Sequence, residues 1–312
     1  EIEQGEISAM ALGYDRKLYI LAFDHRGSFE KMFGISGRAP TAEETERIQD
    51  AKHLIWEGFK RAVEEGAPKD AAGVLVDGQY GPDVAREAKA GGYVLAMPVE
   101  KSGQEEFDFE YGDQFGEKIL EFDPTFSKVL VRYNVAGDGE MNTRQAARLK
   151  RLSDWLHEHD RKFLFELLVP ATPAQLEQVG GDGERFDRKL RPGLMMDAIR
   201  ELLAAGVEPD IWKIEGLDSR DDCRAIAELV RAGGRDQVSC VVLGRGASDA
   251  KVDEWLLAGA GLPGYVGFAI GRSIFSTAMK ALAAGEGARE DGVAAIARNY
   301  RRFIDVYESG SA

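Results

Sequence analysis

The chain has 312 residues, of which 40 are Lys or Arg and 54 are Asp or Glu, so its net charge at pH 7 is −14. Because nucleic acids and anionic membranes attract clustered Lys and Arg, this balance predicts no nucleic-acid partner and no membrane partner. A composition of 44% hydrophobic and 30% charged residues is typical of a protein with a buried core and argues against disorder. No run approaches the roughly 18 apolar residues of a membrane span.

The N-terminal residues EIEQGEISAM lack the basic-then-apolar layout of a secretory signal, and the chain begins without Met. We therefore expect a cytoplasmic protein that was processed or cut from a longer chain. Cys223 and Cys240 are too few for a disulfide framework and lack metal-ligand spacing, so we expect two buried thiols. With four histidines in the sequence, a His-rich metal site is hard to build.

Short apolar runs alternate with stretches of helical periodicity along the whole chain. Apolar residues recur every three or four positions in Thr41–Glu65 and Thr143–His157, and a third helix, Pro192–Ala205, begins with Pro. The strands are apolar nearly throughout, which suits a parallel sheet covered on both faces. The eight expected strands are Leu18–Asp24, Gly73–Asp77, Tyr93–Val99, Ser127–Tyr133, Lys162–Val169, Asp210–Glu215, Ser239–Leu243 and Gly264–Ile270.

Eight strand-then-helix units in this length predict an α/β fold, a single closed (β/α)₈ TIM barrel. The alternative is an open doubly wound sheet, which normally carries GxGxxG after its first strand. Here the first strand is followed by DHRG, and the GxGxxG that begins at Gly259 precedes a strand, so we interpret it as a loop. No Pro- or Ser-rich linker divides the chain, and we predict one domain over residues 1–312.

Two segments are expected to be loose. Glu100–Asp123 is acidic and predicts a solvated loop with a short helix, and Ala171–Arg191 is long and polar. Because loops that follow barrel strands lie on the catalytic face, each segment is either a lid or a plain surface loop. The sequence leaves both interpretations open.

Charged residues interrupt three apolar strands, and the reacting groups of a barrel stand at the C-terminal ends of its strands. Lys213, in DIWKIE, is expected to be partly desolvated, and a neutral Lys can attack a ketone to form a Schiff base. The alternative is a structural ion pair with a carboxylate such as Glu166. Glu166 is itself either a salt-bridge partner or a general acid/base whose pKa burial raises. The third such residue is Lys128.

Two Gly-Arg turns, Gly244-Arg245-Gly246 and Gly271-Arg272, follow the seventh and eighth strands. Barrels often bind phosphate at this place. Glycines let backbone N–H groups approach phosphate oxygens, and Arg can bind them bidentately. Two such turns on consecutive strands therefore predict a phosphate site.

The segments LYILAFDHRGSF, SKVLVRYN, FLFELLV, DIWKIEG, VVLGRG and GFAIGRSIF together resemble class I aldolases of the tagatose-1,6-bisphosphate aldolase type. More closely, they resemble the bacterial 5-dehydro-2-deoxyphosphogluconate aldolase domain of myo-inositol catabolism. The resemblance extends from Leu18 to about Phe275. It implies fusion or association with a 5-dehydro-2-deoxygluconokinase, and it is compatible with a homo-oligomer.

Carried over residue by residue, the resemblance implies that Lys213 is the Schiff-base lysine and Glu166 the acid/base. Lys128 and Asp24 would order the substrate hydroxyls and help to keep Lys213 neutral. No cofactor and no metal are implied, because the iminium withdraws the electrons that a Lewis acid would otherwise withdraw.

The same resemblance implies the substrate-binding residues. Two positions depart from the tagatose enzymes: Arg132 replaces an aromatic residue, and Gly244 replaces a phosphate-binding Ser. An extra Arg suits a phosphorylated keto-sugar acid, whose carboxylate lies at the end away from the phosphate. The residues expected to bind substrate are His25 (where the tagatose enzymes have Gln), Arg26, Arg132, Gly244, Arg245, Gly246, Gly271 and Arg272.

The implied reaction is cleavage of 6-phospho-5-dehydro-2-deoxy-D-gluconate to dihydroxyacetone phosphate and malonic semialdehyde. One alternative is another ketose-phosphate aldolase, for tagatose or sulfofructose phosphates. Further alternatives are a non-catalytic sugar-phosphate sensor and a metal-dependent aldolase, and the shortage of histidines counts against the last.

Overall fold

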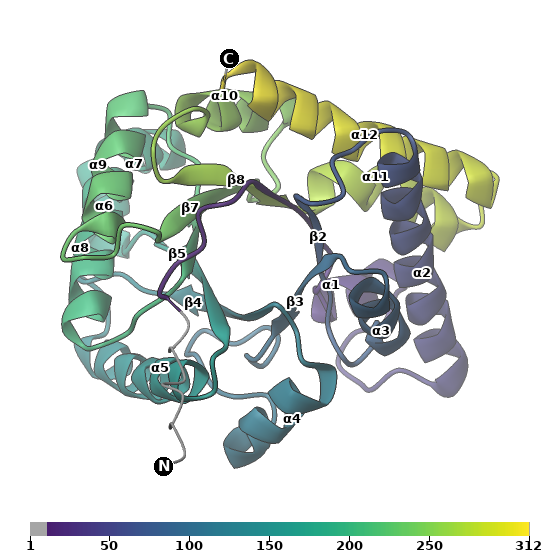
Figure 1. Cartoon of the computed structure of the whole chain (residues 1–312), viewed down its shortest axis with the longest axis horizontal. Coiled ribbons are helices and arrows are strands. Elements are labelled where there is room, and N and C mark those ends of the chain that lie inside the picture. Colours follow the sequence, from purple (N-terminus) through teal and green to yellow (C-terminus); the bar gives the residue numbers. More distant parts are fainter. Residues whose placement is uncertain (1–10, 312) are drawn as a thin grey trace, which may run out of the picture.

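The computed structural model describes residues 11–311, which form one closed barrel of eight strands (Figure 1). Each strand runs parallel to both neighbours in chain order, and β1 closes the ring against β8. The predicted (β/α)₈ barrel is therefore confirmed. The stretch in which we expected no secretory signal, residues 1–10, lies outside the described residues. The strands are β1 (Leu18–Ala22), β2 (Ala72–Leu75), β3 (Val94–Pro98), β4 (Phe126–Arg132), β5 (Lys162–Leu168), β6 (Ile211–Glu215), β7 (Ser239–Leu243) and β8 (Tyr265–Ile270).

The interior of the barrel is filled by apolar side chains that alternate along the strands with outward-facing ones. Phe126, Leu164 and Ile211 belong to this interior cluster, whereas their strand neighbours Phe163 and Trp212 join the larger core between sheet and helices. Each strand is thus covered on both faces, which explains its nearly continuous apolar sequence. At Gly267 the strands approach so closely that a Cβ atom would lie 1.9 Å from the carbonyl oxygen of Leu18.

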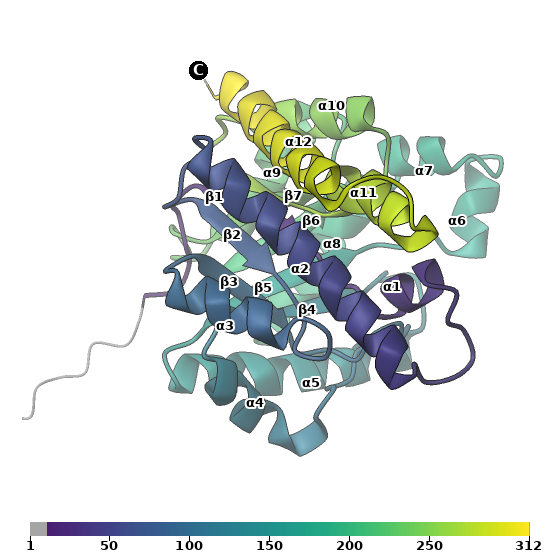
Figure 2. The ribbon, with the colours of Figure 1, turned by 90° about the vertical axis from the view of Figure 1, so that its right-hand side faces the viewer.

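Helices surround the barrel, and six of those in the described residues begin at a side-chain cap. Thr41 and Glu44 form a capping box at the start of α2, which runs beside the C-terminal helix α12 (Figure 2). The three helices expected from periodicity are present as α2, α5 and α8. The helices are α1 (Gly27–Met32), α2 (Ala42–Glu64), α3 (Pro82–Ala90), η1 (Gly112–Gln114), α4 (Phe115–Phe122), α5 (Gly139–Glu158), α6 (Pro173–Gln178), α7 (Gly183–Lys189), α8 (Arg191–Ala204), α9 (Arg220–Arg231), α10 (Asp249–Gly259), α11 (Arg272–Ala284) and α12 (Arg289–Ser309).

The two segments expected to be loose, Glu100–Asp123 and Ala171–Arg191, both contain helices. The first contains the predicted short helix, α4, preceded by a loop that an isolated bridge between Glu100 and Phe109 closes. The second was expected to be a loop but contains α6 and α7. Thr172 and Asp182 cap these helices by accepting hydrogen bonds from the backbone N–H groups of Gln175 and Arg185, a local signal that outweighs the polar composition.

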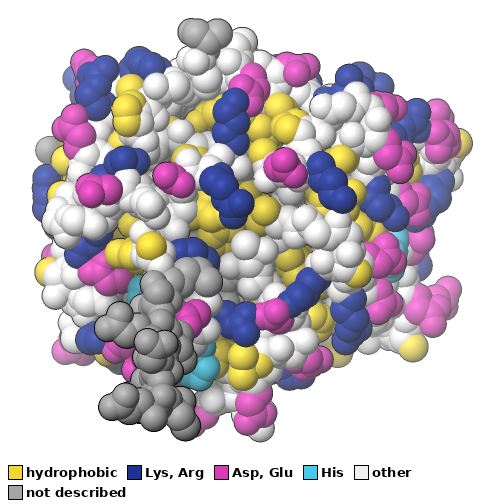
Figure 3. All heavy atoms as spheres, in the orientation of Figure 1, with side chains coloured by type: hydrophobic (Ala, Val, Ile, Leu, Met, Phe, Trp, Pro, Cys, Tyr) yellow, Lys and Arg dark blue, Asp and Glu magenta, His cyan; other side chains and the backbone are white. Residues whose placement is uncertain are grey.

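The surface carries both signs of charge. On the face drawn in Figure 3, which has the orientation of Figure 1, basic and acidic side chains are interspersed. Within residues 11–311, no helix is long and apolar enough to cross a membrane.

Candidate active site

Three charged side chains stand one layer above the apolar interior of the barrel. Because side chains alternate along a strand, the residue two positions after an interior residue also points inward. Lys128 follows Phe126 in this way, Glu166 follows Leu164, and Lys213 follows Ile211. The strand register then pairs Glu166 of β5 directly with Lys213 of β6. The charges that interrupt the apolar strands are therefore brought together at the floor of the barrel mouth.

Lys128 is held by three carboxylates. Its Nζ atom lies 2.8 Å from Oδ2 of Asp24, 2.6 Å from Oε1 of Glu100 and 3.2 Å from Oε2 of Glu166. Burial alone would lower the pKa of Lys128, but the three carboxylates raise it above its ordinary value. Lys128 is therefore a fixed positive charge that stays protonated at neutral pH.

The pKa values of Asp24 and Glu100 are shifted in opposite directions. Burial would raise the pKa of Asp24, but the Lys128 ammonium, with His25 and Lys213, lowers it below its ordinary range. The pKa of Glu100 is raised, because burial outweighs the contact with Lys128 and the neighbouring Asp24 carboxylate adds to the effect. Asp24 is thus the stable anion beside Lys128.

Lys213 and Glu166 form a buried pair. Nζ of Lys213 lies 2.9 Å from Oε1 of Glu166, and the two residues are 4% and 7% exposed. We expected burial to raise the pKa of Glu166. Burial does act in that direction, but Lys213 and Lys128 outweigh it, and the pKa of Glu166 is lowered. Glu166 is therefore ionised at neutral pH and is ready to accept a proton from Lys213 or from a bound molecule.

A further buried lysine holds the end of β1 in place. Lys52 of α2 pairs with Asp77 and donates hydrogen bonds to the carbonyl oxygens of Phe23, at 2.6 Å, and His25, at 3.0 Å. Burial lowers the pKa of Lys52, yet its side chain is fully enclosed outside the barrel mouth. We infer that Lys52 is a structural residue that positions the DHRG turn.

The barrel mouth contains two adjoining cavities, of about 240 Å³ and 290 Å³, which share Lys213 and Glu166 in their walls. Every residue that we expected to act on or bind substrate lines at least one of them. The first cavity is lined by Asp24, His25, Arg26, Lys128, Arg132, Glu166 and Lys213, among others. The second is lined by His25, Arg132, Glu166, Lys213, Gly244, Arg245, Gly246, Gly271 and Arg272, among others.

The second cavity contains the two Gly-Arg turns. Gly271 precedes helix α11, and a Cβ atom there would lie 2.0 Å from the carbonyl oxygen of Ala22. At Gly246, where φ is +72°, a Cβ atom would lie 2.9 Å from the guanidinium carbon of Arg272. Close packing against the backbone thus demands glycine at position 271, and the left-handed backbone conformation favours it at position 246. Within the described residues, the Arg272 guanidinium forms no hydrogen bond or ion pair, so it is free to bind an anion at the start of α11.

Arg245 is arranged differently from Arg272. Its guanidinium pairs with Asp187 of α7 and lies 3.1 Å from Oε1 of Glu215. These two carboxylates raise the pKa of Arg245 and neutralise its charge. Arg245 therefore ties α7 to the turn after β7, and an anion would have to compete with Asp187 for it.

His25 and Arg132 line both cavities. Burial lowers the pKa of His25 to about 4, and the nearby cations Lys213 and Lys52 add to the shift, so its imidazole is neutral at pH 7. Its buried Nδ1 atom has no hydrogen-bond partner among the described residues. Arg132 donates a hydrogen bond to the carbonyl oxygen of Gln104 at 2.8 Å, which places its guanidinium at the rim of the mouth.

Glu100 lines the first mouth cavity, although we assigned it no role in the site from the sequence. Its position directly after the third strand was the available signal, because Asp24 occupies the same place after the first strand. The Oε2 atom of Glu100 is buried without a hydrogen-bond partner in the described part of the chain. Across residues 11–311, no three His, Cys, Asp or Glu side chains are grouped so that they could hold a metal ion.

Fold and site together define a (β/α)₈ barrel with a buried lysine–carboxylate centre at its mouth. The DUF2090 family, described as uncharacterized proteins conserved in bacteria, matches residues 8–310, and the chain belongs to this family.

Curated relatives that match part of this chain are tagatose 1,6-diphosphate aldolases. Tagatose 1,6-diphosphate aldolase 2 of Streptococcus pyogenes serotype M1 is 27% identical over 168 residues, which are 51% of this chain and 46% of that enzyme. The chain thus matches about half the length of this curated relative.

Two solved structures share the fold. A fructose-bisphosphate aldolase from Slackia heliotrinireducens superimposes with a TM-score of 0.52 at 13% identity, over 90% of this chain and 85% of that one. A Schiff base forming fructose-1,6-bisphosphate aldolase gives a TM-score of 0.51 at 14% identity, over 92% and 94% of the two chains. At this identity the likeness establishes the barrel fold.

Proposed function

We propose that this protein is a class I aldolase that cleaves a ketose phosphate through a Schiff base on Lys213. The observation that carries the proposal is the buried Lys213–Glu166 pair, with 2.9 Å between Nζ and Oε1, at the floor of a cavity that also contains a free arginine at a Gly-Arg turn. Named relatives and fold neighbours that are aldolases support it.

The choice of Lys213 over Lys128 rests on their surroundings. A Schiff base needs a neutral amine. Lys128 is surrounded by three carboxylates that hold its proton, whereas Lys213 faces one, Glu166, which can take the proton directly.

The proposed reaction begins when Nζ of Lys213 attacks the ketone carbon and water leaves, which forms an iminium. Glu166 then accepts the proton of the hydroxyl group on the carbon β to the iminium. As the carbon–carbon bond between the α and β carbons breaks, its electron pair moves into the iminium and leaves an enamine. The aldehyde departs, the enamine is protonated at carbon, and water releases the second product and the free lysine.

For the substrate we propose 6-phospho-5-dehydro-2-deoxy-D-gluconate, which would give dihydroxyacetone phosphate and malonic semialdehyde. Arg272 and the start of α11 offer a phosphate site on one side of Lys213. Arg132, which lines both cavities, would bind the carboxylate at the other end of the substrate. Neutral His25 and the Lys128–Asp24 pair would bind the hydroxyl groups between them.

The proposal also covers the domain organisation, location and partners of the chain. We propose that the chain acts as one domain in the cytoplasm, fused to or associated with a 5-dehydro-2-deoxygluconokinase, with a homo-oligomer as a compatible state. Tagatose 1,6-bisphosphate is the second candidate substrate, because the curated relative named above is a tagatose 1,6-diphosphate aldolase.

A product assay across candidate ketose phosphates tests the proposal. Dihydroxyacetone phosphate released from each substrate is measured with a coupled reduction, while calorimetry measures binding. We expect turnover of at least one substrate, and the highest kcat/KM for the one that carries a carboxylate. Binding without any dihydroxyacetone phosphate would instead indicate a sugar-phosphate sensor.

A further inference from the structure

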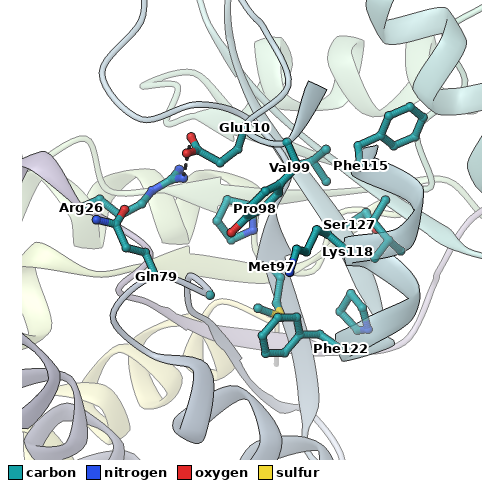
Figure 4. A pocket seen from close by; sticks show the side chains of 14 residues that line it. Arg26, Gln79, Met97, Pro98, Val99, Glu110, Phe115, Lys118, Phe122 and Ser127 are labelled. Carbon is teal, nitrogen blue, oxygen red and sulfur yellow. Dashed lines mark ion pairs between the residues drawn. The ribbon is translucent and has the colours of Figure 1, made fainter. Parts of the chain in front are cut away.

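A second kind of cavity, of about 180 Å³, lies outside the barrel wall beneath helix α4 (Figure 4). Met97 of β3 and Ser127 of β4 face it, while their strand neighbours Ala96 and Lys128 point into the barrel. The sheet therefore lies between Lys213 and the part of this cavity that Met97 and Ser127 line. The other apolar side chains in its lining are Val99, Phe115, Ile119 and Phe122.

Two buried polar groups in the lining lack a hydrogen-bond partner among the described residues, Oγ of Ser127 and Nε of Arg26. These residues are 2% and 6% exposed, so water solvates them poorly. A buried donor without an acceptor is costly.

Arg26 is the charged end of the cavity. It donates a hydrogen bond from Nη2 to the carbonyl oxygen of Glu100 at 3.0 Å. Two carboxylates face it at longer range: Oε1 of Glu100 lies 3.9 Å from Nη2, and the carboxylate of Glu110 lies 3.6 Å from Nη1. Figure 4 shows Glu110 facing the Arg26 guanidinium from the rim. Because 3.6 Å is longer than a charge-assisted hydrogen bond, Glu110 satisfies this guanidinium poorly.

The volume of the cavity limits the size of a ligand that it can hold. A dry cavity of about 150 Å³ binds benzene, so the volume here admits one six-membered ring or a branched chain of similar size with a short polar group. The apolar walls favour such a body, and the buried guanidinium favours an anion.

We propose that this cavity is a second ligand site, which takes a small monocarboxylate with an apolar body about the size of benzene. The carboxylate would bind Arg26 in place of Glu110, and the apolar body would lie among Met97, Phe115 and Phe122. The proposal does not depend on the aldolase reaction, although Arg26 lines both this cavity and the first mouth cavity.

Calorimetry with benzoate on the full chain tests this proposal. We expect saturable binding of benzoate, and binding at least about tenfold weaker for benzyl alcohol, which keeps the ring but lacks the charge. Glu110→Gln should tighten benzoate binding severalfold, because the competing carboxylate is gone. The matched control is Glu105→Gln, an exposed acid in the same loop outside the cavity lining, and it should leave binding unchanged.

Filling the cavity should abolish binding. Ser127→Ile removes the unpartnered hydroxyl and projects apolar atoms into the space. Gly78→Val is a second filling variant, since a Cβ atom there would lie 3.4 Å from Phe122 and 3.6 Å from Met97. At least one of the two should fold, as judged by its melting temperature, and should bind benzoate at least tenfold more weakly.

The proposal would be overturned by absence of benzoate binding to the wild type, by equal affinity for benzoate and benzyl alcohol, or by unchanged binding in a folded filling variant. Inorganic phosphate and Arg272→Ala separate this site from the barrel mouth. Displacement by phosphate, or loss of binding in Arg272→Ala, would assign benzoate to the barrel mouth and would equally refute a second site.

Discussion

Lys128 and Lys213 stand side by side in one barrel but have unlike surroundings. Three carboxylates contact Lys128 and one contacts Lys213, and both side chains are buried. A buried charge that loses its partners costs far more than an ordinary surface charge. Replacing each lysine by methionine, which has a similar length and no charge, should therefore have different consequences.

Lys213→Met should fold normally and lose nearly all turnover, with kcat reduced by at least about a thousandfold, because the nucleophile is gone while Glu166 keeps its contact with Lys128. Lys128→Met should lower the free energy of unfolding by about 3–5 kcal/mol, because three buried carboxylates lose their shared cation. Urea unfolding and steady-state kinetics of both variants measure these effects. Full activity of the Lys213→Met variant would exclude Lys213 as the nucleophile.

Neutral His25 predicts a particular acid sensitivity. In the folded chain its pKa is lowered to about 4 from an ordinary value of 6.5, so the unfolded chain takes up a proton on His25 at higher pH than the folded chain does. The free energy of unfolding should thus fall by up to about 3 kcal/mol from this residue as pH decreases from 6.5 to 4, and the loss should be complete below pH 4.

His25→Asn should remove this part of the pH dependence, which urea unfolding at a series of pH values will show. His53→Asn, on helix α2 outside the two mouth cavities, is the control and should retain it. An unchanged slope between pH 4 and 6.5 in His25→Asn would mean that His25 is not held neutral in the folded protein.

In the proposed reaction, the turn after β8 and the end of β4 would bind opposite ends of one substrate. Arg272 stands at the start of α11 without a partner in the described chain, and Arg132 ends β4. Arg272→Ala should cost about 2–4 kcal/mol of transition-state binding for every phosphorylated substrate. Arg132→Ala should weaken binding of the carboxylate-bearing substrate and leave a ketose phosphate that has no carboxylate almost unaffected.

Ratios of kcat/KM for both variants on both substrates measure this difference. Equal losses for Arg132→Ala on the two substrates would remove the residue-level support for a sugar-acid substrate, while leaving the aldolase proposal intact.

The strands and the floor of the site could be predicted from the sequence because alternation along a strand is a local property. A charged residue two positions after an apolar interior residue must point inward, as Lys213 does after Ile211. The sign of the Glu166 pKa shift could not be predicted, because it depends on two lysines from β4 and β6. The contact of Arg245 with Asp187 joins residues 58 positions apart, and α7 itself was missed because its polar composition hid its cap.

At the scale of the whole molecule, closure of the barrel brings the charged strand ends together. Asp24 on the first strand and Lys128 on the fourth are 104 residues apart in the chain and 2.8 Å apart in space. Because a Schiff base does the work of a Lewis acid, prolonged EDTA treatment should leave the proposed turnover unchanged. Loss of activity that Zn²⁺ or Co²⁺ restores would place the protein among metal-dependent aldolases.

The central claim is a covalent intermediate on one lysine of this barrel. Treatment with borohydride and dihydroxyacetone phosphate should reduce the iminium to a stable secondary amine, inactivate the enzyme, and add the mass of the reduced adduct to the peptide that carries Lys213. Lys213→Met should acquire no adduct in the barrel. An adduct on Lys128, or on Lys101, which also lines the first mouth cavity, would contradict the account. So would the absence of an adduct in a protein that turns over ketose phosphates.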